Sequence, residues 1–440
     1  MRNAFNKLWN SNKGSALIIA AAAFPAIVGA AGLATDTIQW ALWKRQLQRA
    51  ADSAAIAGVY TRSRTDTTAA VNTAVNADLA LNQHTGFSLR SAPTVALLGD
   101  SGTMLKRVQV GLEVQHSLPF SSMFMVSSPI IRANAIAASV PGSDEYCVIT
   151  LEPSVTKTGI TIGGNSKISM NCGMISNSPS ANSALSNGTS SSVTATVIAA
   201  VGAVQASRQW LVDKYDPYTT AAQDPYGTIN PTAAEMSGCA ANPPAATDTT
   251  VVAAGAATLC YSSITVGSNK TWNLGTDKTI FVTGKNKTTA GSVVIHGTLK
   301  CIRCTIILTN KDMASDAKIG TFDMQAQAQL NITPFVGATD KYKGIAVFQD
   351  RRAVDVNGSG SPNKFNGGGT QVIEGAIYFP SQSVTYNGNG TATAVCTRFV
   401  SRRIIFSGNS SATNYFEKGS NCAGAGLDGV EGGRLVRLVA

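Results

Sequence analysis

The residues best suited to chemistry include a pair of cysteines at close spacing, Cys301-Ile302-Arg303-Cys304. The C-x-x-C spacing can close a redox disulfide or hold half of a zinc site, and His296 is nearby. A zinc site needs further ligands, and the sequence offers no second close cysteine pair. We therefore favour a structural disulfide, or two separately paired cysteines, over redox or metal chemistry.

A second candidate is the segment Gln349–Asp355, which places Asp350 and Asp355 beside Arg351 and Arg352. Polysaccharide-cleaving sites use convergent carboxylates, either as an acid/base pair or as calcium ligands. Carboxylates are sparse in this part of the chain, so a solvated loop with local ion pairs is the favoured interpretation. Nearby aromatic residues could stack on sugar rings or fill a core; these are Tyr342, Phe365 and Tyr378.

A third candidate, Gly99-Asp100-Ser101-Gly102, resembles the sequence around a serine nucleophile. The chain has three histidines, His84, His116 and His296, and none has the sequence context of a catalytic base. We interpret the segment as a turn.

Composition narrows the protein classes further. The chain has 440 residues, a formal net charge of +10 and only 14% charged residues, against a typical value of about 25%. The basic residues are dispersed and form no run with interleaved aromatics, which argues against a nucleic-acid partner. The length predicts at least two folding units.

The first forty residues indicate a membrane. Ala16–Ala34 is a run of nineteen uncharged, mostly apolar residues, about the length of a membrane-spanning helix. Arg2, Lys7 and Lys13 precede it, so the positive-inside bias predicts a cytoplasmic N-terminus with the rest of the chain exported. We expect a retained single-pass anchor in a bacterial inner membrane, with a periplasmic or surface-exposed C-terminal domain. The alternatives are a signal peptide cleaved after Ala34 and a core helix.

All cysteines lie beyond this run, and their number is even. Disulfides are the natural interpretation for an exported domain. Eight cysteines allow many pairings, and short loops favour Cys147 with Cys172, Cys239 with Cys260 and Cys396 with Cys422. The candidates are Cys147, Cys172, Cys239, Cys260, Cys301, Cys304, Cys396 and Cys422.

After the apolar run the pattern becomes that of an amphipathic helix. Apolar residues recur at intervals of three and four along one stripe, which turns from Trp to Ala along its length; they are Trp40, Trp43, Leu47, Ala50, Ala54 and Ala57. Small side chains allow close approach, so we expect this stripe to pack on the chain's own small domain or on another subunit. The residues assigned to membrane insertion and helix packing are Pro25, Asp36, Trp40, Trp43, Leu47, Ala51 and Asp52.

These features carry a resemblance. Gly14-Ser15-Ala16 opens the apolar run, Pro25 lies within it, Asp36 follows it, and Leu47–Gly58 reads LQRAADSAAIAG. The region resembles the N-terminus of TadG/TadE-like proteins of tight-adherence (Flp) pilus assembly systems. The resemblance implies an inner-membrane-anchored protein of pilus biogenesis, adherence or the cell envelope, and no enzymatic activity.

Two departures from related patterns are visible. A prepilin-type signal has Glu at the fifth position after a cleaved Gly, and counting from Gly14 this chain has Ile19 there. Some relatives carry a von Willebrand-type A domain with a D-x-S-x-S metal loop, and that string does not occur in the sequence. We therefore expect neither pilin-type polymerisation nor that domain.

Residues 61–141 are predicted to form a small α+β, pilin-like unit after the anchor of residues 1–60. Thr67–Asn82 has a helical pattern, Arg107–Gln115 alternates as a half-buried strand does, and Pro129–Val140 could add another strand. Pro141-Gly142 marks a boundary, because both residues interrupt regular structure.

Residues 144–440 read as short apolar runs separated by Gly, Asn, Ser and Thr, typical of an all-β domain. Gly-Asn follows an apolar strand residue in three places, around Gly164, Gly388 and Gly408, and both residue types tolerate sharp turns. We predict a parallel β-helix, with an antiparallel β-sandwich as the alternative. Proline-rich steps indicate a loop insertion near residues 210–258.

These observations lead to a non-enzymatic, membrane-anchored component of pilus assembly or envelope adherence, which presents a disulfide-stabilised β-domain for binding and needs no cofactor or metal. The expected partners are the inner membrane, other pilus-assembly subunits, and peptidoglycan or a surface glycan. A membrane-tethered β-helix polysaccharide lyase or hydrolase and a cleaved, released adhesin are the alternatives.

Overall fold

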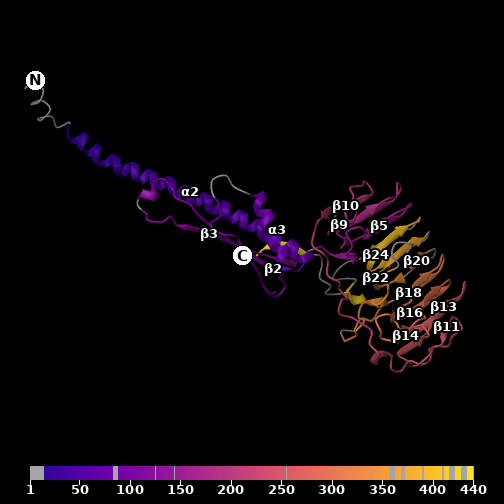
Figure 1. Ribbon diagram of the computed structural model, residues 1–440. Coiled ribbons are helices and arrows are strands. Elements are labelled where there is room, and N and C mark those ends of the chain that lie inside the picture. The colour runs from indigo at the N-terminus through magenta and orange to yellow at the C-terminus, as the bar shows by residue number, and fades with distance from the viewer. Residues whose placement is uncertain are drawn as a thin grey trace, which may run out of the picture. The chain divides into compact units, whose positions relative to one another are not determined.

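The computed structural model describes residues 14–82, 88–123, 125–142, 144–253, 255–337, 339–355, 362–367, 372–388, 391–408, 411–415, 422–427 and 434–439. The chain divides into two compact units (Figure 1). Unit 1 comprises Met1–Val140 with Val436–Ala440, and unit 2 comprises Pro141–Leu435.

Unit 1 begins with α2 (Gly14–Arg64), a helix of 51 residues that continues through Pro25. Its N-terminal half is long and apolar enough to cross a membrane. Its C-terminal half packs on the shorter helix α3 (Thr68–Leu81) and on the sheet. Thr67 caps α3, because its Oγ1 accepts a hydrogen bond from the Ala70 N–H at 3.4 Å. The predicted helix over Thr67–Asn82 therefore lies within a residue of the observed one.

The sheet of unit 1 has the order β1-β2-β3-β26. Its strands are β1 (Thr94–Leu97), β2 (Leu105–Gln115), β3 (Ile130–Pro141) and β26 (Arg434–Leu438). The β1–β2 and β2–β3 pairs are antiparallel. Val108, Val110 and Val114 alternate along β2 and are fully buried, as the sequence pattern predicts for a half-buried strand.

The last strand of the sheet comes from the far end of the chain. Val436 packs on the apolar core of unit 1, and the Val439 N–H donates to the Ile136 carbonyl at 2.8 Å. We expected the β-domain to extend over residues 144–440, whereas these final residues complete the sheet of unit 1. The chain thus passes from unit 1 to unit 2 after β3 and returns at β26.

Unit 2 consists mainly of short strands. They are β4 (Tyr146–Thr150), β5 (Ile160–Ile162), β6 (Lys167–Met170), β7 (Gly173–Ser176), β8 (Ala184–Ser186), β9 (Ser192–Ala200), β10 (Trp210–Pro217), β11 (Ala245–Thr247), β12 (Thr258–Tyr261), β13 (Ser263–Val266), β14 (Thr271–Val282), β15 (Val293–Ile295), β16 (Thr298–Leu308), β17 (Phe322–Met324), β18 (Gln329–Ile332), β19 (Ile345–Gln349), β20 (Asn363–Gly367), β21 (Val372–Ile373), β22 (Gly375–Gly388), β23 (Thr391–Val395), β24 (Thr397–Ser407) and β25 (Ser411–Tyr415).

The strands of unit 2 pair in parallel and form long ladders. One ladder runs β12-β14-β16-β19-β22-β24-β4-β7-β9-β10. A second runs β11-β13-β15-β17-β20-β22-β24-β5-β8. Further parallel pairs join β14-β16-β18-β21 and β23-β25-β6-β9. The antiparallel β-sandwich that we kept as an alternative is wrong, because every pairing between the named strands of unit 2 is parallel among the described residues.

The order of strands in the ladders differs from their order in the chain. β4, the first strand of unit 2, pairs with β24, one of the last. From β4 the chain proceeds to β10 at one end of the ladder, resumes at β11 and β12 at the other end, and returns strand by strand to β24. Residues 218–244, which we call the connecting segment, must therefore span the ladders.

We expected a loop insertion near residues 210–258. The structure differs in part, because β10, the short helix η2 (Ala234–Met236) and β11 lie within that range and the connecting segment occupies only residues 218–244.

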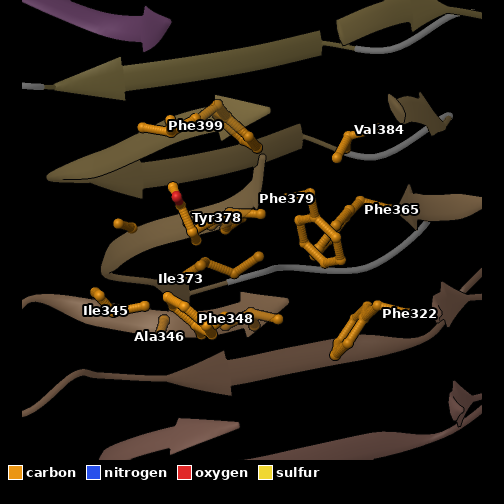
Figure 2. Close-up of a cluster of buried hydrophobic side chains, with 14 of the residues drawn as sticks. Phe322, Ile345, Ala346, Phe348, Phe365, Ile373, Tyr378, Phe379, Val384 and Phe399 are labelled. Atoms are coloured by element: carbon orange, nitrogen blue, oxygen red, sulfur yellow. The ribbon is translucent and has the colours of Figure 1, made fainter. Parts of the chain in front are cut away.

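The core of unit 2 contains like side chains stacked from one strand to the next (Figure 2). The rings of Phe322 and Phe365 stack with centroids 4.9 Å apart, as do those of Phe348 and Tyr378. Phe348 and Tyr378 are register partners of β19 and β22, so parallel pairing places one ring on the other. Phe365 is the register partner of Met324, and its ring stacks on Phe322, two residues before Met324 on the same face of β17.

The Gly-Asn turns singled out in the sequence also lie one above another. Gly164 and Gly408 both have positive φ, at +64° and +77°. The Asn165 N–H donates to the Gly408 carbonyl at 2.8 Å. A Cβ on Gly164 would lie only 2.7 Å from that carbonyl oxygen, so close stacking of the two turns requires glycine.

A matched pair of valines tests the stacked core. Val347 in β19 is fully buried, whereas Val354 is 65% exposed. We expect V347A to lower the free energy of unfolding by about 2 kcal/mol, because it removes buried methyl groups and leaves a cavity. Urea unfolding of the full chain, followed by circular dichroism, measures the change. V354A is the control and should differ little from wild type; equal effects of the two substitutions would contradict the assigned core.

Candidate functional site

The N-terminal half of α2 exposes large apolar side chains all along its length. Ile19, Phe24 and Ile27 are each more than 60% exposed within unit 1. Pro25 lies in the same stretch and is also exposed. Such a surface is unfavourable in water and favourable in a hydrocarbon environment. This part of α2 is also long and apolar enough to cross a membrane, which suggests membrane anchoring.

The C-terminal half of α2 buries a stripe of small and apolar side chains. Leu47 and Ala51 are fully buried, and Trp43 is 5% exposed with its ring edge-on to His116 at 5.3 Å. Trp40 is only half-buried. Gly58 lies where a Cβ would be 2.9 Å from Val108, so the helix approaches β2 closely. The partner of the predicted packing stripe is thus the chain's own small unit.

The two aspartates assigned to this helix have polar roles. Asp36 is 2% exposed, and its Oδ2 accepts hydrogen bonds from the Ser121 N–H and hydroxyl, both at 2.5 Å. Asp52 accepts a hydrogen bond from Gln48 Nε2 at 2.8 Å, and the same nitrogen donates to the Asn134 carbonyl on β3. Both contacts supply partners that water would otherwise provide.

In unit 2, the acidic segment predicted around Asp350 is held by arginine contacts. Arg352 pairs with Asp350 at 2.8 Å and donates to the carbonyls of Asn310, Asp312 and Ala314. The Thr309 hydroxyl also donates to the Asp350 carboxylate, at 2.7 Å. The Asp350 carboxylate is therefore already bound by Arg352 and by Thr309 from the neighbouring turn of the ladder.

Arg351 binds the connecting segment. Its guanidinium pairs with Asp224 at 2.8 Å and donates to the Tyr226 carbonyl at 2.6 Å. The Tyr378 hydroxyl donates to the same Asp224 oxygen at 2.9 Å, and burial, together with the Asp224 charge, raises the pKa of Tyr378 above its usual range. Tyr378 is thus a hydrogen-bond donor at any physiological pH.

The remaining carboxylate, Asp355, belongs to a buried cluster that the sequence did not reveal. Arg403 pairs with Asp355 at 2.6 Å and also contacts Glu152, which Arg402 binds at 3.0 Å. The Glu152 side chain is fully buried. Burial alone would lower the pKa of Arg403, but the hydrogen bonds that its guanidinium donates to Asp355 and Glu152 raise it. The sequence signals for this cluster are weak: adjacent arginines at a strand bend in a chain with few charges.

This arrangement does not provide paired acid/base chemistry. A glycosidase-type site needs one protonated carboxyl and one free carboxylate facing a substrate, whereas Asp350 and Asp355 are each paired with arginine inside the protein. Glu374 differs, since burial raises the pKa of its carboxyl, but it lies in the turn between β21 and β22 and away from the turn after β19 that holds Asp350. The local ion pairs of the favoured interpretation are present, but its solvated loop is wrong, because Asp350 is only 4% exposed and the Asp355 side chain only 10%.

The aromatic residues considered for sugar stacking lie in the interior. Phe365 and Tyr378 are fully buried and Tyr342 is 4% exposed. They contact other aromatic rings of the core. They do not form an exposed stacking surface.

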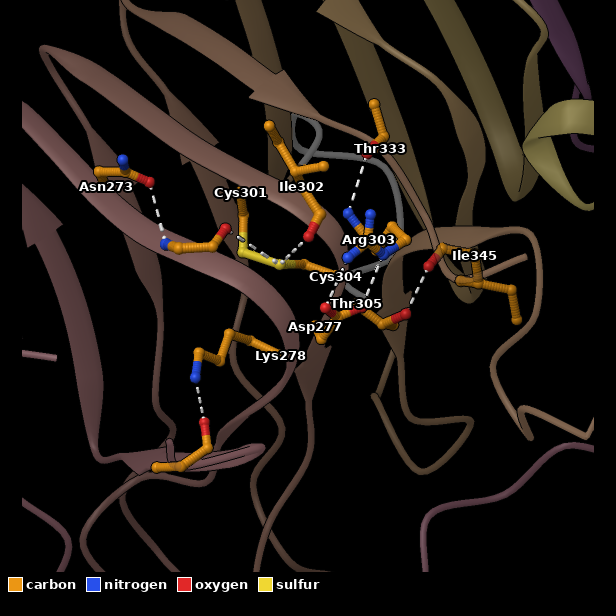
Figure 3. The surroundings of a disulfide bond; sticks show 12 residues. Asn273, Asp277, Lys278, Cys301, Ile302, Arg303, Cys304, Thr305, Thr333 and Ile345 are labelled. Carbon is orange, nitrogen blue, oxygen red and sulfur yellow. Dashed lines mark hydrogen bonds and ion pairs between the residues drawn. A yellow bond between two sulfur atoms is a disulfide. The ribbon is translucent and has the colours of Figure 1, made fainter. Parts of the chain in front are cut away.

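The C-x-x-C segment forms a disulfide within β16 (Figure 3). Both cysteines are buried, at 2% and 0% exposure. Between them Arg303 adopts a positive φ of 52°, and its guanidinium forms two hydrogen bonds with Asp277, at 2.7 and 2.6 Å. His296 is exposed, and the described residues contain no cluster of three or more potential metal ligands. The disulfide therefore has a structural role: it joins the two sides of the irregular backbone at Arg303 within β16.

The other six cysteines form the pairs that the loop lengths favoured, Cys147–Cys172, Cys239–Cys260 and Cys396–Cys422. Cys239 belongs to the connecting segment, so its disulfide fastens that segment to β12. The carbonyls of Cys239 and Ala240 also accept hydrogen bonds from Lys311.

The serine of the Gly99–Gly102 segment lies in a turn. Ser101 and Met104 exchange backbone hydrogen bonds at 3.0 Å, and Asp100 accepts from the Lys106 N–H at 2.9 Å. His116 packs on Trp43, and His84 lies outside the described residues. The turn interpretation agrees with these contacts.

Comparison with known proteins identifies the N-terminal part of the chain. Residues 14–71 match a family model described as "Putative Flp pilus-assembly TadE/G-like". The chain matches no curated protein and no solved structure. The matched range covers α2 and the start of α3, so the predicted resemblance is confirmed for this segment.

The Glu152 cluster can be tested by removing its buried charge. We expect E152Q to lower the free energy of unfolding by about 3 kcal/mol, because it leaves Arg402 and Arg403 with one buried carboxylate, Asp355, in place of two. The matched control is D277N, which removes one partner of the exposed Asp277–Arg303 pair and should change stability little. Urea unfolding of both variants measures the difference. Comparable stability of E152Q and D277N would contradict a buried structural cluster.

Glu374 gives a pH-dependent prediction. Its pKa is raised on folding, so the folded state retains this proton over a window in which the unfolded chain has lost it. Stability is therefore lost as pH rises from about 4.3, the unfolded value, through the folded pKa. We expect E374Q to raise the Tm relative to wild type at pH 7 and to leave it nearly unchanged well below pH 4.3. A gain that is the same at both pH values would contradict the shift.

Proposed function

Because residues 14–71 form a TadE/G-like segment, we propose that this protein is an inner-membrane-anchored, non-enzymatic component of Flp (tight-adherence) pilus assembly. The observation that carries the proposal is the coincidence of the family segment with α2, whose exposed apolar half precedes a half packed on unit 1. One helix thus joins the membrane to a folded unit.

The orientation follows from charge and cysteine chemistry. Arg2, Lys7 and Lys13 precede the apolar run, which favours a cytoplasmic N-terminus. All four disulfides lie beyond the run, and disulfides persist in an oxidising compartment such as the periplasm. Both features support placement of units 1 and 2 on the periplasmic side, with access to the cell surface through the assembly.

For unit 2 we infer a parallel β-helix that presents a binding surface. The parallel ladders and the stacked glycine turns support this fold. Its partners would be other pilus-assembly subunits, and peptidoglycan or a surface glycan. The arginine-paired carboxylates favour binding over polysaccharide cleavage, because the acidic residues of the candidate site are already neutralised within the protein.

A charged substitution in the apolar run tests the proposal in cells. We expect the wild-type gene to restore Flp pili and surface adherence to a deletion strain, with the full-length chain in the inner-membrane fraction. I27R should abolish membrane retention and pili, because a charge at mid-span costs roughly 2.5–3.5 kcal/mol of insertion. Ile27 is 64% exposed in unit 1, so loss of internal packing does not account for such a result.

The matched control is L81R, which places the same charge at an 87% exposed leucine at the end of α3. It should behave as wild type. A C-terminal tag, protease treatment of intact cells and of spheroplasts, and gels with and without reductant report topology and disulfides. Normal pili in the deletion strain would contradict the assembly role, and a shortened chain in the medium would favour the released adhesin.

A further inference from the structure

The loop between β2 and β3, residues 116–129, exposes apolar side chains that no part of unit 1 covers. We call its described residues, 116–123 and 125–129, the hairpin tip. Met123, Met125 and Val126 are 75%, 44% and 109% exposed. The short helix η1 (Ser121–Met123), which is part of the tip, lies against α2. Exposed apolar residues gathered at one tip mark an interaction surface.

Two contacts fix where the hairpin tip lies along α2. The Phe120 ring covers Gly32 so closely that a Cβ on this glycine would lie 2.2 Å from a ring carbon. One helical turn later, Ser121 donates two hydrogen bonds to Asp36. The tip is therefore held against the last turn of the apolar run and the first charged residue after it.

This position corresponds to the boundary of the bilayer. Nineteen residues of helix rise about 28 Å, close to the thickness of the hydrocarbon core, so Gly32 lies roughly 3 Å inside its edge. Beyond Asp36 come the half-buried Trp40 and then Lys44 and Arg45, an order typical of a headgroup region. Because Asp36 accepts two hydrogen bonds from Ser121, its carboxylate does not depend on water at this depth.

An open groove lies between the same elements. It has a volume of about 520 Å³ and is lined mainly by apolar residues, Trp40, Ala41, Met125, Pro129, Ile130 and Ile131. Lys44 and Arg132 also line it. An apolar groove with basic residues suits a phospholipid, because the apolar residues can contact its acyl chain and the basic residues its phosphate.

We propose that the hairpin tip inserts Met123, Met125 and Val126 into the interfacial layer of the bilayer that α2 spans, as a second membrane contact. This inference rests on the proposed membrane anchoring. The occupant is lipid, because the tip lies against the last turn of the apolar run, where Leu33 and Ile38 are also exposed, and Lys44 beside it complements anionic headgroups. A helix held at one further point in the interface has a restricted tilt and rotation.

Site-specific fluorescence in vesicles tests this second contact. The native cysteines are all in disulfides, so an introduced thiol can be labelled alone. Full-length V126C and M123C, each carrying an environment-sensitive fluorophore, are reconstituted into vesicles of zwitterionic and anionic phospholipids. We expect blue-shifted emission and strong quenching by a lipid spin-labelled near its headgroup, with weaker quenching by one labelled near the end of its acyl chain.

Two further positions separate failure of this inference from failure of the proposed anchoring. I27C reports the span and should be quenched most by the lipid labelled near the chain end, whereas L81C, on the exposed end of α3, should not be quenched. Quenching at Ile27 without quenching at Val126 and Met123 would overturn the hairpin-tip insertion and leave the anchor intact. Absence of quenching at Ile27 would overturn the anchor, and the inference with it.

Discussion

Burial of the small-residue stripe on α2 is the contact on which unit 1 depends. The same helix has to remain apolar on all sides where lipid surrounds it and has to become amphipathic where protein does. Leu47, Ala51 and Val59 are completely buried, and Gly58 allows Val108 of β2 to come within contact distance. Larger side chains on this stripe would push the helix off the sheet. The small residues of the stripe therefore let α2 lie close to the sheet of unit 1.

Unit 2 is governed by a different constraint, which is the mismatch between chain order and ladder order. Because β10 and β11 lie at opposite ends of the ladders, residues 218–244 have to cross them, and polar contacts hold this segment along its course. Asn177 exchanges hydrogen bonds with Ala222, Arg351 binds Asp224, and Lys341 binds Glu235. The Cys239–Cys260 disulfide completes the series. The arginine-rich segment after β19, which in the sequence resembled a catalytic motif, thus serves to fasten this crossing.

Features with a local cause were predictable from the sequence. The period of Trp40 to Ala57 gives the packing stripe, alternation gives β2, and paired Gly-Asn turns at similar spacing indicate stacked parallel strands. Features made by distant residues were not. Arg403 meets Glu152 across 251 positions of the chain, and β26 joins a sheet whose other strands end near residue 141. No periodic pattern around Glu152 or Arg434–Leu438 indicates which distant residues they contact. These contacts can be seen only in the folded structure.

The ends of the ladders bear on how unit 2 can bind a partner. Parallel ladders end in strands with unpaired backbone groups, which can recruit further strands unless they are protected. At one end, β10 carries Asp213, Lys214 and Asp216 and finishes at Pro217, and Lys214 pairs with Asp144 and Asp216. The first ladder ends opposite β10 in β12, which has four residues, and the second ladder ends in β8 and β11, which have three residues each. Charge, proline and short length are features that oppose edge-to-edge addition, so growth by strand addition is disfavoured at both ends.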